Sequence, residues 1–173
     1  MPRNIEIKAR INSVEALLTA ARTLARSEPA VIEQDDTFFT VPHGRLKLRE
    51  FADGSAELIH YHRPDSGEAK ASDYVRVAVP DAAALREALQ RACGLLGRVR
   101  KTRLLVLVDE AGFSTRIHID RVRGLGEFME LEVVLKPGQS DSEGTAVAQA
   151  LMSRLDLADA PRLAGSYLDL MGR

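Results

Sequence analysis

Basic residues at every second position are the feature of this sequence that most directly suggests chemistry. Arg45, Lys47 and Arg49 alternate with leucines, and Lys101 and Arg103 repeat the spacing. Side chains two apart on a β-strand point the same way, so each segment presents its cations on one face. The planar guanidinium of Arg donates two parallel hydrogen bonds to a phosphate group. Faces of this kind suit a polyanion.

Carboxylates follow the same spacing near both ends of the chain. Glu6 alternates with apolar residues in IEIKARI (Ile5 to Ile11), and Glu130 and Glu132 alternate with apolar residues near the other end. Carboxylate oxygens are preferred ligands of hard divalent cations. A further strand carries Arg116, His118 and Asp120 on one face. Together these faces suggest a site for a polyanion and a divalent cation.

Two arrangements of these faces remain open. One-sided antiparallel sheets are common, so each charged face taken alone is explained by contact with water. Three cations at i, i+2 and i+4, however, repel one another unless an anion or facing acids neutralise them. Because several strands share this design, we favour a closed lumen that holds the charges while the apolar faces lie outside under helices.

The strands and helices that must position these residues follow from periodicity and turn signals. Helices are expected at 12–26, opened by a capping box of Asn12 and Glu15, and at 80–94, 142–155 and 166–171. Eight strands are expected at 5–11, 31–41, 45–51, 56–63, 73–79, 97–109, 113–122 and 127–135. Short connections imply antiparallel neighbours, and a long antiparallel sheet tends to close on itself. The predicted fold is α+β, a closed eight-stranded antiparallel barrel with helices outside; a two-layer α+β sheet is the alternative.

Composition limits the partners. The 173 residues predict one domain over 1–173, with 24 Lys and Arg against 25 Asp and Glu. This balance argues against a nucleic-acid or membrane partner. The single Cys93 excludes an internal disulfide and is expected to be a core thiol. No signal peptide or membrane span is recognised, so a cytoplasmic location is expected.

Six sequence blocks, in order, resemble the CYTH family, also called triphosphate tunnel metalloenzymes. This family includes class IV adenylyl cyclases, thiamine triphosphatases and inorganic triphosphatases. The blocks lie at 4–8, 34–39, 44–49, 60–65, 72–74 and 124–132, and the last three, with Phe38 and Phe39, are most similar to the cyclase branch. The resemblance implies a barrel that binds a triphosphate with Mg²⁺ or Mn²⁺.

Functional residues carry over from the family by position. The resemblance implies four metal-binding residues, Glu6, Asp120, Glu130 and Glu132. It implies eight triphosphate-binding residues: Lys8, Arg45, Lys47, Arg49, Arg63, Lys101, Arg103 and Arg116. The signature's first glutamate is Asn4 in this chain, which removes one negative charge from the expected metal site.

The function expected from this resemblance is metal-dependent chemistry on a nucleotide or other triphosphate. In class IV cyclases the ribose 3′-hydroxyl attacks the α-phosphorus of ATP, and cyclic AMP and pyrophosphate are the products. The alternatives are hydrolysis of inorganic or thiamine triphosphate, and a non-catalytic module that binds triphosphate or polyphosphate, which Asn4 would favour. No residue is assigned as the catalytic group, and a homodimer is the assembly that cyclase relatives suggest.

Other residues carry weaker signals. The four histidines lack the close spacing of a zinc site. Gly124-Leu125-Gly126 precedes no helix, so it is read as a tight turn rather than a phosphate-binding loop. The segment around Tyr167 is expected to pack on the barrel as a helix, with a gating role as the alternative.

Overall fold

The computed structural model describes residues 3–62 and 70–172. Its strands are β1 (Arg3–Arg10), β2 (Ala30–Phe39), β3 (Arg45–Phe51), β4 (Ala56–His62), β5 (Lys70–Ala78), β6 (Leu95–Glu110), β7 (Phe113–Val122) and β8 (Gly126–Leu135). Its helices are α1 (Val14–Arg22), α2 (Ala82–Cys93), α3 (Asp141–Arg154) and α4 (Tyr167–Leu170). None of these described helices is long and apolar enough to cross a membrane.

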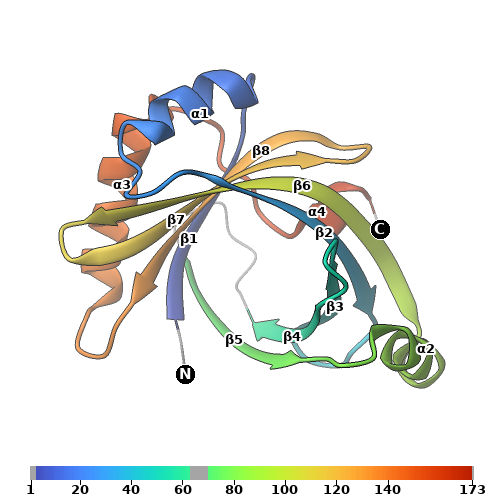
Figure 1. The fold of residues 1–173 in the computed structure, drawn as a ribbon. Helices are drawn as coiled ribbons and strands as arrows, with labels where there is room; N and C mark the ends of the chain where they lie inside the picture. The colour runs from blue at the N-terminus through green and yellow to red at the C-terminus, as the bar shows by residue number, and fades with distance from the viewer. Residues whose placement is uncertain (1–2, 63–69, 173) are drawn as a thin grey trace.

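The eight strands form a closed barrel in the order β1-β5-β4-β3-β2-β6-β7-β8, with every neighbouring pair antiparallel. Figure 1 shows this ring of strands with the helices on its outside. The predicted closed barrel is therefore confirmed, and the two-layer alternative is wrong. Pairing of β1 with both β5 and β8 closes the sheet.

Helix α1 differs from its predicted bounds at both ends. Ser13, not Asn12, is its N-cap, because the Ser13 hydroxyl accepts a hydrogen bond from the Ala16 N–H. The helix ends at Arg22 rather than Arg26. There the Leu24 N–H donates to the carbonyl of Ala21, three residues back, which tightens the last turn and stops the helix.

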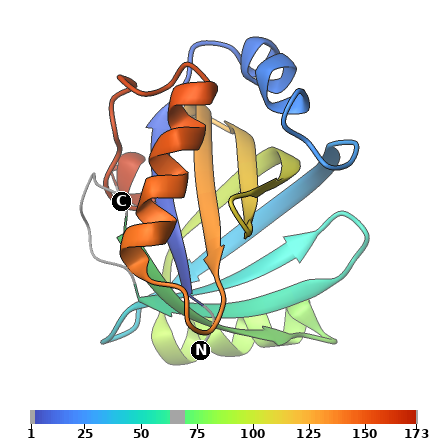
Figure 2. The same cartoon turned by 90° about the vertical axis from the view of Figure 1, so that its left-hand side faces the viewer.

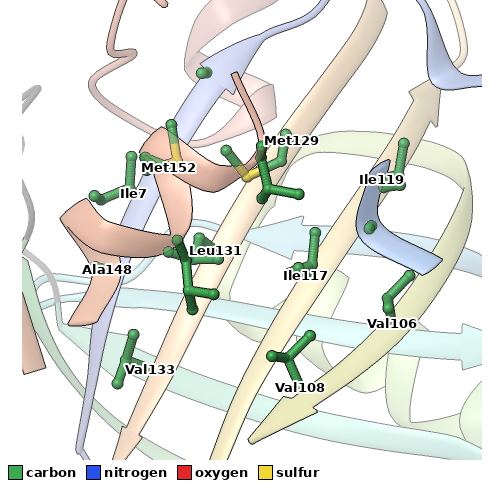
Figure 3. Close-up of a cluster of buried hydrophobic side chains, with 14 of the residues drawn as sticks. Ile7, Val106, Val108, Ile117, Ile119, Met129, Leu131, Val133, Ala148 and Met152 are labelled. Carbon is green, nitrogen blue, oxygen red and sulfur yellow. The ribbon is translucent and has the colours of Figure 1, made fainter. Parts of the chain in front are cut away.

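The main hydrophobic core lies outside the barrel. Helix α3 packs along β1 and β8, as Figure 2 shows. Figure 3 shows its side chains over the apolar face of the sheet, where Ile7, Ile117 and Leu131 are almost fully buried. Because these residues alternate with Glu6, Arg116 and Glu130, burial of the apolar face turns the charges inward.

Two smaller clusters hold the other helices. Helix α2 packs against Phe39 and Leu48, and the partly buried Cys93 belongs to this cluster, as expected for a core thiol. Helix α4 packs Leu168 against Val99 and Phe128. The helix predicted around Tyr167 therefore does pack on the barrel.

Candidate functional site: a charged cavity inside the barrel

A cavity of about 380 Å³ lies within the barrel, and its wall is built from alternate residues of the strands. Among the described residues, seven Lys or Arg and five Asp or Glu side chains line it. The cavity therefore carries an excess of positive charge, although the whole chain has a formal net charge of −1. An excess of cations in an enclosed space attracts an anion.

Most of the residues singled out from the sequence meet in this cavity. The nine that line it are Glu6, Lys8, Lys47, Arg49, Lys101, Arg103, Arg116, Glu130 and Glu132. Arg45 and Asp120 are not among its lining residues. Arg63 lies outside the described residues.

Asp36 on β2, a residue without a predicted role, organises cations on β3 and β6. It is 1% exposed, and its carboxylate accepts two hydrogen bonds from Arg49, both at 2.7 Å, and one from Lys47 at 2.9 Å. Lys101 Nζ lies 3.5 Å from the same carboxylate. Burial alone would raise the pKa of Asp36, but these cations hold it well below its usual range. One carboxylate thus fixes three cations whose combined charge it does not balance.

Both lysines of this group have a lowered pKa, although Asp36 acts in the opposite direction. Burial, together with the neighbouring Arg49, lowers the pKa of Lys47 to about 8. Burial lowers the pKa of Lys101 to about 7, with Arg49 and Arg103 acting in the same direction and Asp36 opposing them. A bound polyanion would stabilise the charged form of both lysines.

Arg103 is held by a fully buried acid behind the cavity wall. Its guanidinium donates to both oxygens of Asp120, at 2.7 and 2.6 Å, and the Tyr167 hydroxyl donates to Asp120 Oδ2 at 2.7 Å. Burial opposes the charge on Asp120, but Arg103 brings the pKa of this carboxyl to about 2. Burial and the facing Asp120 raise the pKa of the Tyr167 hydroxyl well above its usual value, so Tyr167 remains a donor. In this arrangement both oxygens of Asp120 are engaged with Arg103 and Tyr167.

Glu130, Glu132 and His118 bring their ligand atoms within 4.8 Å of one another. Glu130 Oε2 also accepts a hydrogen bond from Arg103 at 3.0 Å, and Glu132 Oε2 one from Arg116 at 3.3 Å. Burial would raise the pKa of Glu130, but Lys8 and the other neighbouring groups hold it well below the usual range. Two anionic carboxylates beside a buried ring nitrogen fit the ligand set of a divalent cation.

Arg45 contacts the C-terminal helix rather than the cavity. Its guanidinium lies 2.6 Å from Asp169 Oδ2 and donates to Ser166 Oγ at 2.9 Å. Both acceptors belong to the capping box that begins α4. Arg45 therefore ties α4 to β3 beside the cavity, where Ser166 and Tyr167 form part of the wall.

Asn4 lies on the cavity wall, on the same strand face as Glu6. It is 3% exposed, and its Oδ1 has no hydrogen-bond partner among the described residues. A buried carbonyl oxygen without a hydrogen bond destabilises the folded state, so such an oxygen normally accepts one. The residue at which the signature departs from its pattern thus has a buried oxygen without a hydrogen-bond partner and lies in the wall of the charged cavity.

Three residues contribute to the site although the sequence analysis assigned them no role there: Asp36, His118 and Tyr167. His118 shares a strand face with Arg116, and this pattern already placed it beside the expected site. Asp36 shares a face with Gln34 and Phe38, a mixture that does not identify an inward side. The segment around Tyr167 was expected to pack on the barrel, but its hydrogen bond to Asp120 had no signal in the sequence, since it joins residues 47 positions apart.

A family model for the CYTH domain matches residues 2–167, so the chain belongs to the CYTH family. The closed antiparallel barrel and its inward charges agree with the tunnel that this membership implies. A search of curated proteins finds no significant match to this chain.

Solved structures share the fold at low sequence identity. The PH1012 protein from Pyrococcus horikoshii OT3 is 22% identical, with a TM-score of 0.81, over 96% of this chain and 98% of that one. A candidate adenylate cyclase from Vibrio parahaemolyticus is 20% identical, with a TM-score of 0.76, over 98% of both chains. HpAC1 from Hippeastrum, a candidate adenylyl cyclase described as having a dominant triphosphatase activity, is 13% identical, with a TM-score of 0.65, over 91% of this chain and 89% of that one.

Proposed function

We propose that this protein is a metal-dependent enzyme that acts on a nucleotide or other small triphosphate inside the barrel. The observation that supports the proposal is the cavity itself, in which inward Lys and Arg side chains from β1, β3, β6 and β7 face a group of carboxylates. The chain as a whole has a formal net charge of −1, yet the described residues that line this cavity include more Lys and Arg than Asp and Glu. That placement suits a compact polyanion.

The residues of the chain would act mainly by positioning and charge stabilisation. Arg49, Lys47 and Lys101 would bind phosphate oxygens, since Asp36 holds them together without balancing their charge. Arg103 would present its guanidinium in the orientation that Asp120 and Tyr167 impose. Such preorganised charges stabilise a transition state in which negative charge builds up on phosphate oxygens.

Glu6, Glu130 and Glu132 are the residues that would hold Mg²⁺ or Mn²⁺. When bound, the ion would neutralise charge on the triphosphate. Asp120, which the resemblance also implied as a ligand, is assigned here to positioning, because both of its oxygens contact Arg103 or Tyr167.

Two reactions suit the same cavity. In a cyclase, a ribose 3′-hydroxyl attacks the α-phosphorus, the bond to the bridging oxygen breaks and pyrophosphate leaves. The sequence blocks near 60–65, 72–74 and 124–132 favour this reaction. In a hydrolase, water attacks the terminal phosphorus, the bond to the bridging oxygen breaks, the diphosphate part of the substrate leaves and inorganic phosphate forms; the similarity to HpAC1 favours this reaction. A single cysteine fits a reducing, cytoplasmic setting for either one.

A product assay tests the proposal. The purified chain is incubated with ATP, tripolyphosphate or thiamine triphosphate, each with Mg²⁺ and with Mn²⁺, and cyclic AMP, pyrophosphate and phosphate are measured. We expect metal-dependent turnover of at least one substrate. Tight binding of triphosphate without any product would instead favour a non-catalytic binding module, and the absence of both would refute the proposal.

A further inference from the structure

His118 is a buried imidazole placed between two carboxylates. It is 5% exposed, and its Nδ1 lies 3.7 Å from Glu130 Oε2 and 3.7 Å from Glu132 Oε1. Nδ1 has no hydrogen-bond partner among the described residues. The pairing of β7 with β8 sets His118 directly across from Glu130, so the sheet fixes this arrangement.

These distances are long for a hydrogen bond, whose N–O separation is about 2.7–3.2 Å. They match two ligands of one ion, since atoms bonded at about 2.1 Å and separated by angles of about 90–120° lie about 3.0–3.7 Å apart. A buried nitrogen without a hydrogen-bond partner, 3.7 Å from an oxygen of each of two carboxylates, therefore has the placement of a third ligand.

We propose that His118 Nδ1 is a metal ligand together with Glu130 and Glu132, and that it selects a divalent transition metal such as Mn²⁺ over Mg²⁺. This inference rests on the proposed function, because it concerns the metal of the same site. It goes further by naming a nitrogen ligand and the class of ion that the ligand favours.

The selectivity follows from the donor atoms. Mg²⁺ is a hard ion that prefers oxygen ligands, whereas imidazole suits the first-row transition metals. The oxygens of this site are also shared with cations, since Arg103 contacts Glu130 and Arg116 contacts Glu132. Because Asn4 stands at the position of the signature's first glutamate, the site also lacks one carboxylate. Each of these features weakens the site for Mg²⁺ more than for an ion that also binds nitrogen.

Electron paramagnetic resonance of Mn²⁺ bound to the full-length protein provides the direct test, without any substrate. Pulsed measurements report the coupling between Mn²⁺ and a directly bound imidazole nitrogen. We expect this coupling in the wild type, and we expect it to change when the protein carries ¹⁵N-labelled histidine. This readout does not require a variant to fold.

Variants then assign the nitrogen and test the selectivity. His118→Ala and His118→Gln should lose the coupling and raise the Kd for Mn²⁺ at least tenfold, while the Kd for Mg²⁺ changes less than threefold. Glu132→Gln should raise the Kd for both ions. His43→Gln, at an exposed histidine, should change neither.

Three results would overturn the inference: no nitrogen coupling in the wild type, coupling that persists in His118→Gln, or equal losses of Mn²⁺ and Mg²⁺ affinity in His118→Ala. These results are separable from failure of the proposed function. Imidazole-bound Mn²⁺ without turnover of any triphosphate would refute the activity and leave the metal site. Turnover with Mg²⁺ but no imidazole coupling would do the reverse.

Discussion

At the residue scale, Asn4 occupies the first position of the family signature, lies in the cavity wall and has a buried oxygen without a hydrogen-bond partner. The metal site proposed at Glu130 and Glu132 therefore has one negative charge fewer than the signature provides. A single substitution at Asn4 tests whether that charge can be restored.

We expect Asn4→Glu to tighten divalent-metal binding about tenfold, which corresponds to about 1.4 kcal/mol. The reason is the Coulomb energy between the added carboxylate and the ion. Calorimetric titration of Mn²⁺ measures the change, and Asn4→Gln controls for side-chain length without charge. A loss of tripolyphosphate affinity with no gain for the metal would show instead that the new carboxylate pairs with cavity cations such as Lys8.

Lys101 gives the cavity a dependence on pH. With a pKa of about 7, its ammonium is charged below that pH and neutral above it. We expect its ¹³Cε resonance to titrate near pH 7, and tripolyphosphate to move the midpoint upward because an anion stabilises the charged form. The charged groups around it are Asp36, Lys47, Arg49 and Arg103.

The lowered pKa of Lys101 also affects the folding stability of the chain. The pKa of Lys101 is lower in the folded chain than its ordinary value of 10.5, so the unfolded chain binds more protons between about pH 7 and 10.5. The contribution of Lys101 to folding stability should therefore rise with pH across this window. A midpoint near 10.5 in the folded protein would contradict both expectations.

At the element scale, close approach of α3 to the barrel depends on Gly144. A Cβ added there would lie 2.7 Å from Leu135 Cδ2 and 2.8 Å from Ile5 Cγ1, and both side chains are buried in the core. This contact helps to hold the apolar face of β1 and β8 outward. It thereby keeps Glu6 and Glu132 inward.

We expect Gly144→Ala to destabilise the fold by about 1–3 kcal/mol, because overpacking outweighs the better helix propensity of alanine. Urea unfolding measures the change. Ala146→Gly, at an exposed position of α3, reports the propensity effect alone. Increased stability in Gly144→Ala would mean that α3 lies farther from the barrel than in this structure.

The strands also show where the inward face can be predicted from periodicity alone. Over residues 5–11 of the first strand, 116–120 of β7 and 129–133 of β8, apolar residues alternate with charged residues or histidine, so the inward face could be predicted. In β2, Asp35 and Asp36 are adjacent and both faces mix polar with apolar residues, so alternation did not identify Asp36 as the inward acid. Only the pairing of β2 with β3, which sets Asp36 opposite Arg49, resolves the choice.

At the scale of the whole molecule, barrel closure could be predicted from the number of strands and their short connections. What could not be predicted depends on contacts between distant segments. Arg45 was expected among the phosphate ligands, yet it pairs with Asp169 of α4. Tyr167 reaches Asp120 because α4 folds back onto β6, a contact that no local pattern indicates.

The inward cations are proposed to bind a triphosphate, and β6 offers a matched pair of residues with which to test this claim. Lys101 lines the cavity, whereas its neighbour Arg100 is exposed on the outer face and contacts Asp35. Substitution of either by methionine removes one positive charge from the same strand.

The most direct measurement is therefore calorimetric titration of tripolyphosphate into wild type, Lys101→Met and Arg100→Met, with thermal unfolding as a check on folding. We predict that Lys101→Met raises the Kd at least tenfold and that Arg100→Met changes it less than threefold. Equal effects of the two substitutions, or no binding by the wild type, would contradict the claim.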